Sequence, residues 1–396
     1  MISHDVAVIG GGPAGLHTAR LLAEGGAAVS VFERKPEIGL GVVCTGIVGR
    51  GIFREFDLPT EAAGPEIQDV RIVSSSGRMI LYRHPSPFAA VVDRQKFDQA
   101  LADRARQAGA GIETGTTVLD LEPSSEGLTV KTVRNGEIGF RRVRLVVLAT
   151  GVDRRLHPRM GLTAPKRFVY GAQAEIFDAS NSRPSVFLGT RTAPGGFAWA
   201  VPSGENRSRI GLITNGPPQR TFDDFLTRYY PQADLARAPR PLEIKAIAQG
   251  MAGTSVRDRI LAVGEAAGQV KTTTGGGIYY GLLGARFAAE VILEALGKGI
   301  LAESALAPYE RRWKAALRKE IAVGYYARKL YSWMSEDQFE SLFVLAQSDG
   351  IIPQIQREGN FDWQSGLILS LFRKAPVFEI FKGLSRRPAF MDRLLD

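Results

Sequence analysis

The chain has 396 residues, of which 44% are hydrophobic, and a formal net charge of +9. This length predicts two or three subdomains with sizeable apolar cores. Cys44 is the only cysteine in the sequence, which excludes an internal disulfide, a zinc site built from several thiolates and a four-thiolate iron–sulfur cluster.

The first predicted element is a strand that runs straight into a glycine-rich turn. Residues 5–9 form the strand, and Gly10, Gly12 and Gly15 follow at the spacing of a dinucleotide-binding motif. In this motif the first glycine allows the tight turn, the second lets a pyrophosphate approach the backbone, and the third lets the helix pack on the strand. The helix predicted over 14–23 would direct its positive N-terminus at the phosphates.

The next apolar run, residues 29–32, ends at Glu33, about 20 residues after the turn, where such motifs place an acid. A carboxylate at this point would accept hydrogen bonds from ribose hydroxyls. Because strand, turn, helix and acid occur together, the sequence predicts a nucleotide site rather than a fortuitous glycine turn.

Cys44 lies in a glycine-flanked loop, residues 39–46. A free cysteine is often a small buried hydrophobe. Its position in this loop favours a role in a site instead, and both interpretations stay open on the residues alone.

The middle of the chain alternates between nucleotide-domain elements and inserted strands. A helix is predicted to start near residue 92 and to end at Gly109, and residues 144–151 read as a buried strand. Other segments alternate or cluster as strands and suggest an antiparallel sheet that covers the cofactor; they are residues 70–73, 78–82, 168–177, 186–188 and 210–213.

Phe197 and Trp199 alternate with Ala198 and Ala200, which is the period of a strand. The two rings could simply face a sheet core. Because proline and glycine confine the strand at both ends, its aromatic face could also contact a large apolar ligand.

A second glycine signature lies about 250 residues after the first. A strand predicted to end at residue 263 leads into Gly264 and Glu265, and residues 272–278 then open a helix predicted over 279–296. A glycine turn at a helix N-terminus is an anion platform. A cofactor held at both turns must be long, and FAD meets this requirement whereas NAD would not need the second turn.

These elements predict an α/β fold with a Rossmann-like FAD-binding domain that contains the βαβ unit. The remaining chain is expected to form an antiparallel-sheet substrate domain and a C-terminal helical region. The expected boundaries are 1–58, 92–164 and 252–300 for the FAD-binding domain, 59–91 and 165–251 for the substrate domain, and 301–396 for the helical region.

Helices in the last region are predicted over 309–330, 336–347 and around 367–384. Residues 367–378 are amphipathic and flanked by basic residues, as in helices that lie on membrane surfaces, although such a stripe more often packs on its own protein. Residues 1–4 lead directly into the first strand, and no apolar run reaches about 20 residues. We therefore expect a cytoplasmic protein, with possible peripheral contact at the inner membrane face.

The basic charge fits several classes of partner. Without aromatic–basic repeats or a recognition helix, nucleic acid is the poorest of them, and we expect no nucleic-acid partner. A basic entrance for a phosphate-bearing substrate is compatible with the charge. The four histidines have no metal-like spacing, so no metal is expected.

Together these residues resemble the FAD oxidoreductases of the para-hydroxybenzoate hydroxylase type and, within them, the geranylgeranyl reductase family. The likeness spans most of the chain. It rests on residues 37–39 with 44–46, on Asp93-Arg94 with Phe97-Asp98, and on the run 264–281. The run 193–202 is similar to the family's aromatic motif, usually Tyr-x-Trp-x-Phe-Pro, which lines the prenyl cavity beside the flavin.

The resemblance implies reduction of isolated prenyl double bonds by reduced FAD, on free diphosphates or lipid-attached chains, with hydride leaving flavin N5. It implies catalytic-site roles for Cys44, Phe197 and Trp199, with Cys44 or a bound water as the proton donor. An external electron donor is needed, which could be NADPH, ferredoxin or a reduced quinone. The residues expected to bind FAD are Gly10, Gly12, Pro13, Ala14, Gly15, Glu33, Arg34, Cys44, Arg94, Gly151, Gly264, Glu265, Gly268, Gly275, Gly276, Gly277 and Ile278.

The sequence departs from the family pattern at three positions. Glu265 stands where the family usually has Asp, Phe197 replaces Tyr and Val201 replaces Phe. The longer carboxylate can still reach a ribityl hydroxyl, whereas the lost hydroxyl and ring change the expected cavity wall.

Two other functions are weighed. An aromatic monooxygenase or halogenase is the alternative, because residues 197–202 also loosely resemble the halogenase motif Trp-x-Trp-x-Ile-Pro, although its first tryptophan is absent here. A non-catalytic flavin- and lipid-binding protein is the third interpretation.

Overall fold

A largely parallel sheet forms around β1 (His4–Ile9), which lies between β2 (Val29–Phe32) and β11 (Glu137–Leu148) in the computed structural model. β8 (Gly111–Glu113) continues the sheet beyond β2, and β18 (Ile260–Ala262) and β17 (Val256–Arg257) continue it beyond β11. Val6, Ala7 and Val8 are fully buried, as expected for a parallel strand covered on both faces. The structure describes residues 4–124, 126–178, 180–348 and 350–382.

Three helices pack around this sheet. α1 (Pro13–Glu24) contacts both α3 (Arg94–Gln107) and α5 (Ile278–Lys298). α1 starts with a proline, which suits the first turn of a helix, and the Asp93 carboxylate caps α3 by accepting hydrogen bonds from the backbone N–H groups of Gln95 and Lys96. The helices predicted in these three places are therefore confirmed within about two residues at each end.

An antiparallel ribbon extends the same sheet and was not predicted. β9 (Thr116–Pro123) pairs with β10 (Leu128–Arg134), which pairs with the first half of β11. The strand predicted over 144–151 is thus the buried end of a longer strand. The first half of β11 does not follow the usual alternation of buried apolar and exposed polar residues, because the apolar residues Ile138 and Phe140 are exposed.

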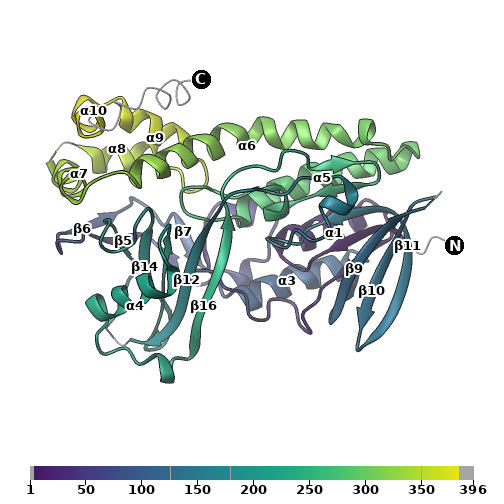
Figure 1. Cartoon of the computed structure of the whole chain (residues 1–396), viewed down its shortest axis with the longest axis horizontal. Coiled ribbons are helices and arrows are strands. Elements are labelled where there is room, and N and C mark those ends of the chain that lie inside the picture. Colours follow the sequence, from purple (N-terminus) through teal and green to yellow (C-terminus); the bar gives the residue numbers. More distant parts are fainter. Residues whose placement is uncertain (1–3, 125, 179, 349, 383–396) are drawn as a thin grey trace.

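The second sheet contains the strands predicted between the nucleotide-domain segments (Figure 1). Most neighbouring pairs are antiparallel, as expected, but β13 pairs with β5 in parallel. The strand predicted over 168–177 matches its observed bounds. In spatial order the strands are β16 (Arg240–Ala248), β12 (Phe168–Phe177), β15 (Arg207–Thr214), β14 (Phe197–Gly204), β13 (Ser185–Phe187), β5 (Asp69–Val73) and β6 (Met79–Arg83).

The two faces of this sheet bury different side chains. Ala198 and Ala200 of β14 belong to the same core cluster as Phe222 and Phe225 of α4 (Pro218–Tyr229). The alternate residues of β14 point to the other face, where Trp199 joins a second apolar cluster. The strand period read from the sequence therefore places the aromatic residues on the face opposite α4.

Short elements connect the two sheets. β3 (Ile47–Gly49), β7 (Ala89–Val91) and β4 (Glu66–Ile67) form a small antiparallel sheet. This sheet joins β3, which was predicted to belong to the FAD-binding domain, to β4 and β7, which were predicted to belong to the substrate domain. The short helices are α2 (Ile52–Glu55) and the 3₁₀ turns η1 (Thr60–Ala62), η2 (Pro158–Met160), η3 (Leu235–Arg237) and η4 (Gly264–Ala267).

The C-terminal helices lie along one side of the molecule (Figure 1). α6 (Glu303–Tyr331) begins earlier than predicted and contains Pro308, and α7 (Glu336–Ser348) matches its prediction closely. The single helix expected around 367–384 is instead two helices, α9 (Ser365–Phe372) and α10 (Ala375–Lys382), because Pro376 favours a new first turn; residues 383–384 lie outside the described part. α8 (Ile351–Glu358) was not predicted.

Across the described ranges, we find no helix with both the length and the apolar character needed to cross a bilayer.

Candidate functional site

The first glycine turn is closely fitted to the sheet on one side and open on the other. Gly10 has φ of +115°, and a Cβ there would lie 2.3 Å from the carbonyl oxygen of Ala149. A Cβ at Gly15 would lie 2.1 Å from the carbonyl oxygen of Gly10, whereas a Cβ at Gly12 would meet nothing within 4 Å. The turn therefore presents its backbone to open space at the start of α1, as a phosphate-binding turn requires.

Glu33 holds this turn in shape. Its Oε2 accepts a hydrogen bond from the backbone N–H of Gly11 at 2.7 Å, and its Oε1 accepts one from the N–H of Lys35 at 2.9 Å. A carboxylate has further lone pairs for ribose hydroxyls. Contact between Glu33 and a ribose stays a prediction.

The structure brings the second glycine turn against the first. Gly264 has φ of +66°, and a Cβ there would lie 2.9 Å from the Cβ of Ala14 on α1. A Cβ at Gly281 on α5 would lie 3.2 Å from the same atom. Two turns about 250 residues apart thus meet through one small side chain, as a cofactor bound by both turns would need.

Glu265 joins the second turn to the end of β16. Its Oε1 accepts a hydrogen bond from the backbone N–H of Ala248 at 3.1 Å. Burial raises the pKa of Glu265, and this hydrogen bond opposes the shift. The longer side chain at this position is therefore fixed by the second sheet.

The glycine loop before α5 rests on the C-terminal region. Lys271 Nζ lies 2.7 Å from Asp362 Oδ1 and donates a hydrogen bond to the carbonyl oxygen of Phe361 at 3.1 Å. The backbone of Lys271 is also bonded to this loop. Its carbonyl oxygen accepts a hydrogen bond from the N–H of Gly275, and its N–H donates one to the carbonyl oxygen of Gly276. Lys271, Phe361 and Asp362 lie in no motif that marks them for this role, and they were not predicted.

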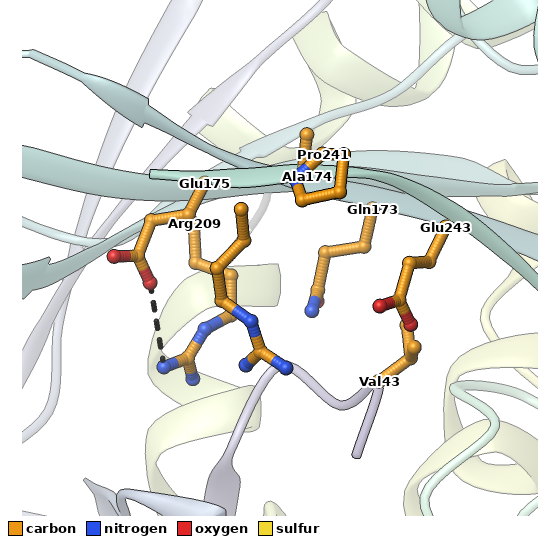
Figure 2. A pocket seen from close by; sticks show the side chains of 8 residues that line it. Val43, Gln173, Ala174, Glu175, Arg209, Pro241 and Glu243 are labelled. Atoms are coloured by element: carbon orange, nitrogen blue, oxygen red, sulfur yellow. Dashed lines mark ion pairs between the residues drawn. The ribbon is translucent and has the colours of Figure 1, made fainter. Parts of the chain in front are cut away.

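The Cys44 loop lies under the second sheet (Figure 2). Gln173 Nε2 donates a hydrogen bond to the carbonyl oxygen of Cys44 at 3.2 Å, and Arg209 Nη1 donates to that of Thr45 at 2.6 Å. Figure 2 shows Gln173 and Arg209 pointing from the sheet toward the segment that carries Val43. They line a small pocket together with Ala174, Glu175, Arg240, Pro241 and Glu243.

Arg94 contacts the Cys44 side chain and forms a two-pronged ion pair with Asp98, with N–O distances of 3.0 and 2.8 Å. Burial opposes the charge of Arg94, but the Asp98 carboxylate outweighs it and raises the pKa of the guanidinium. The backbone N–H of Gly46 donates a hydrogen bond to the Cys44 sulfur at 3.4 Å. These neighbours fix the position of the thiol, whereas contact of Arg94 with a flavin stays a prediction.

Phe197 and Trp199 lie side by side, with ring centroids 5.8 Å apart. Trp199 is 7% exposed, and a Cβ at Gly211 would lie 2.5 Å from its Cζ2, so the indole fills the space above that glycine. Among the described residues, Trp199 Nε1 has no hydrogen-bond partner. Their cluster also contains Val169, Val201, Ile213, Ile247, Phe88 and Phe361.

Sequence comparisons place this geometry in a known group. A profile of FAD-dependent oxidoreductases matches residues 82–294, and one of NAD(P)-binding Rossmann-like domains matches residues 8–61. The digeranylgeranylglycerophospholipid reductase of Methanocaldococcus jannaschii is 30% identical over 367 residues, covering 88% of this chain and 92% of that protein. A second such reductase, from Methanopyrus kandleri, is 31% identical over 381 residues, covering 89% and 93%.

The chain belongs to the geranylgeranyl reductase family of FAD-dependent oxidoreductases.

Solved structures agree on the fold of this family member. A geranylgeranyl bacteriochlorophyll reductase-like protein from Thermoplasma acidophilum superposes with a TM-score of 0.82 at 23% identity, covering 97% of this chain and 98% of that one. The p-nitrophenol 4-monooxygenase of Pseudomonas putida gives 0.72 at 17% identity, covering 90% and 97%. At these identities the likeness shows the fold alone.

The residues of this reductase-family chain fit the FAD that the family uses. The open side of Gly12 and the start of α1 suit the pyrophosphate, and the contact of Gly264 with Ala14 puts the second turn next to the first. Gly277 begins α5 without a side-chain cap, so the backbone N–H groups of its first turn can face the ligand.

The other predicted cofactor residues lie at the edges of this arrangement. Arg34 is largely exposed, 3.6 Å from Asp153, and Gly151 has φ of +62° with open space at its Cβ. Gly268 packs on the backbone of residues 250–252. Their contacts with FAD, like those of Pro13, Gly276 and Ile278, stay predictions.

Proposed function

We propose that the protein reduces isolated carbon–carbon double bonds of polyprenyl chains, carried on a diphosphate or a lipid. When bound and reduced, FAD supplies the hydride. One observation carries the proposal: the glycine loop expected to hold the flavin adjoins the apolar cluster around Trp199. A Cβ at Gly275 would lie 3.1 Å from Ile213 Cδ1 and 3.2 Å from Ile247 Cδ1, two members of that cluster.

An isolated alkene is a poor electrophile, so the protein must hold it against the cofactor and exclude water. Proximity of this kind can lower a barrier by several kcal/mol. The cluster offers a dry wall of aromatic and branched side chains, and Phe361 brings the C-terminal region to it. We infer that the prenyl chain lies along this wall.

The second alkene carbon needs a proton. The Cys44 thiol is our candidate donor, because Arg94 and the Gly46 N–H fix its position and the backbone of its loop is tied to β12 and β15. Hydride and proton together saturate one double bond and leave the cofactor oxidised. An external donor of two electrons must then restore it, and NADPH, ferredoxin and a reduced quinone all meet this need.

The test is an anaerobic mixing experiment. We expect reduced enzyme to be reoxidised by geranylgeranyl diphosphate or by a digeranylgeranyl lipid, with product mass rising by two hydrogens for each saturated bond. A fully saturated phytanyl analogue is the control and should leave the cofactor reduced. The proposal fails if no prenyl substrate reoxidises it, and rapid reoxidation by oxygen with hydroxylation or halogenation of an aromatic would establish the alternative.

Peripheral membrane contact stays a prediction. The apolar residues of α9, Leu367–Phe372, are half-buried and are followed by Arg373 and Lys374. Packing on α6 accounts for part of this burial. Cosedimentation with anionic vesicles, compared between wild type and Leu371→Glu, would test the contact.

A further inference from the structure

Arg328, on α6, is a buried cation without a partner in the part of the chain that the structure describes. It is 8% exposed, and none of its three guanidinium nitrogens has a hydrogen-bond partner among the described residues. Burial lowers the pKa of Arg328 to about 10, against a smaller opposing effect of Tyr331. A buried charge of this kind is costly unless it is paired.

Three other arginines that are buried or nearly so are paired. Arg20 contacts Asp57 at 3.1 Å, and Arg94 contacts Asp98 at 2.8 Å. Arg209 donates to a carbonyl oxygen and lies 4.0 Å from Glu175. Within the described residues, no carboxylate forms an ion pair with Arg328, so this part of the fold leaves the charge of its guanidinium without a counter-ion.

The position of Arg328 links the two parts of the candidate site. One turn earlier on α6, a Cβ at Gly324 would lie 2.7 Å from Thr272 Oγ1, in the loop that precedes α5. One turn later, the Cβ of Ser332 lies 3.1 Å from the place where a Cβ of Gly195 would be, just before β14. Arg328 therefore sits on the helix face that passes from the glycine loop to the aromatic strand. Helical side chains lean toward the N-terminus of their helix, which turns the guanidinium toward the glycine loop.

We propose that Arg328 binds a phosphate group of the prenyl substrate, a role that rests on the proposed function. A guanidinium presents its donors in a planar fork that suits phosphate oxygens, and phosphate would supply the charge that Arg328 lacks. The apolar cluster beside the glycine loop would take the prenyl chain while Arg328 takes its charged end. A diphosphate and a phospholipid headgroup share this chemistry.

The first experiment tests the anion site without a prenyl chain. Inorganic diphosphate at millimolar concentration should raise the melting temperature of the FAD-loaded wild type but not that of Arg328→Met. Without added anion, Arg328→Met should melt higher than wild type, because it removes an unpaired buried charge. Arg318→Met is the matched control, since Arg318 is an exposed arginine on the same helix, and it should respond to diphosphate as wild type does.

Two outcomes would overturn the site. One is a wild type whose melting temperature ignores both phosphate and diphosphate. The other is a variant that melts lower than wild type by the same amount with and without anion, which would show a structural role. If Arg328→Met does not fold, Arg328→Lys serves in its place, and it should bind diphosphate more weakly because it lacks the fork.

The second experiment identifies the source of the phosphate. Dissociation constants for geranylgeranyl diphosphate, a digeranylgeranylglycerol phosphate and uncharged geranylgeraniol can be read from the flavin spectrum. Arg328→Met should weaken binding of at least one phosphate-bearing ligand about 30-fold or more and leave that of the alcohol within about twofold. Loss for the diphosphate alone assigns a soluble substrate, and loss for the lipid alone assigns a headgroup.

Equal loss for the alcohol would overturn the assignment. So would a shift in flavin midpoint potential with unchanged phosphate affinity, since Arg328 would then act on the cofactor. Failure of the proposed function looks different: wild type would show no alkene-dependent reoxidation while diphosphate still stabilised it through Arg328.

Discussion

Lys271 and Asp362 form a buried ion pair that ties the glycine loop before α5 to the segment between α8 and α9. The Nζ–Oδ1 distance is 2.7 Å, and the two side chains are 5% and 9% exposed. Lys271 Nζ also lies 4.4 Å from the centroid of the Phe361 ring, which belongs to the cluster around Trp199. One contact therefore joins the expected cofactor loop, the C-terminal region and the apolar wall.

Asp362→Asn should leave the buried ammonium group of Lys271 without a counter-charge. Removing one partner of a buried pair costs about 3–5 kcal/mol in the free energy of unfolding. The double variant Lys271→Met/Asp362→Leu should recover much of this loss, because apolar pairs often replace buried ion pairs without penalty. Urea unfolding of the two variants measures both effects. If the free energy of unfolding of Asp362→Asn lies within about 0.5 kcal/mol of the wild-type value, the ion pair does not form in solution.

Alanine at Gly12 and at Gly10 should separate cofactor binding from folding. Gly12→Ala meets nothing within 4 Å, so the apo-protein should keep its unfolding free energy within about 0.5 kcal/mol. The added methyl would occupy the approach of the pyrophosphate, and we expect FAD affinity to fall at least about tenfold. Gly10→Ala should instead destabilise the fold by about 1–3 kcal/mol, because of its positive φ and the Ala149 carbonyl.

Fluorescence titration of FAD into each apo-variant, with urea unfolding beside it, makes the comparison. If Gly12→Ala binds FAD as wild type does, the pyrophosphate does not lie at that turn.

The first βαβ unit was predictable because its signals are local: three glycines, a strand and an acid within about 30 residues. The strand over 168–177 was predictable from its own run of side chains. The Lys271–Asp362 pair was not, since each residue reads as an ordinary surface charge and only the fold brings positions 91 residues apart together. Arg328 has the same limitation, because its lack of a partner is a property of packing. The antiparallel ribbon was missed because exposed apolar residues on β11 obscure its alternation.

Cys44→Ala should lower the rate of alkene-dependent cofactor reoxidation about 100-fold. This is the lower end of the effect usually seen when a positioned proton donor is lost. FAD affinity should fall by less than about tenfold, because the thiol is only one of the many contacts expected with the cofactor. Val43→Ala, in the same loop, should react normally. Rapid-mixing kinetics in water and deuterium oxide make the measurement. An unchanged rate in Cys44→Ala would assign the proton to bound water.

His17 should make the fold sensitive to acid. The side chain is 2% exposed on α1, its ring meets Phe56 edge to face at 5.8 Å, and Nδ1 has no partner within the described residues. Burial, reinforced by the positive charge of Arg20, lowers the pKa of His17 from 6.5 to about 3. Between these values the unfolded chain binds a proton that the folded chain does not, so stability falls as pH drops, by about 1.4 kcal/mol per pH unit.

His17→Leu removes this proton site while keeping an apolar side chain of similar volume. We compare the free energy of unfolding of the variant with that of wild type at each pH. From pH 8 to pH 4.5 this difference should shift by about 2–3 kcal/mol in favour of the variant. Urea unfolding at a series of pH values gives the two curves. Curves that stay parallel from pH 8 to 4.5 would show that His17 takes up its proton in the folded protein, and that α1 opens to water at this point.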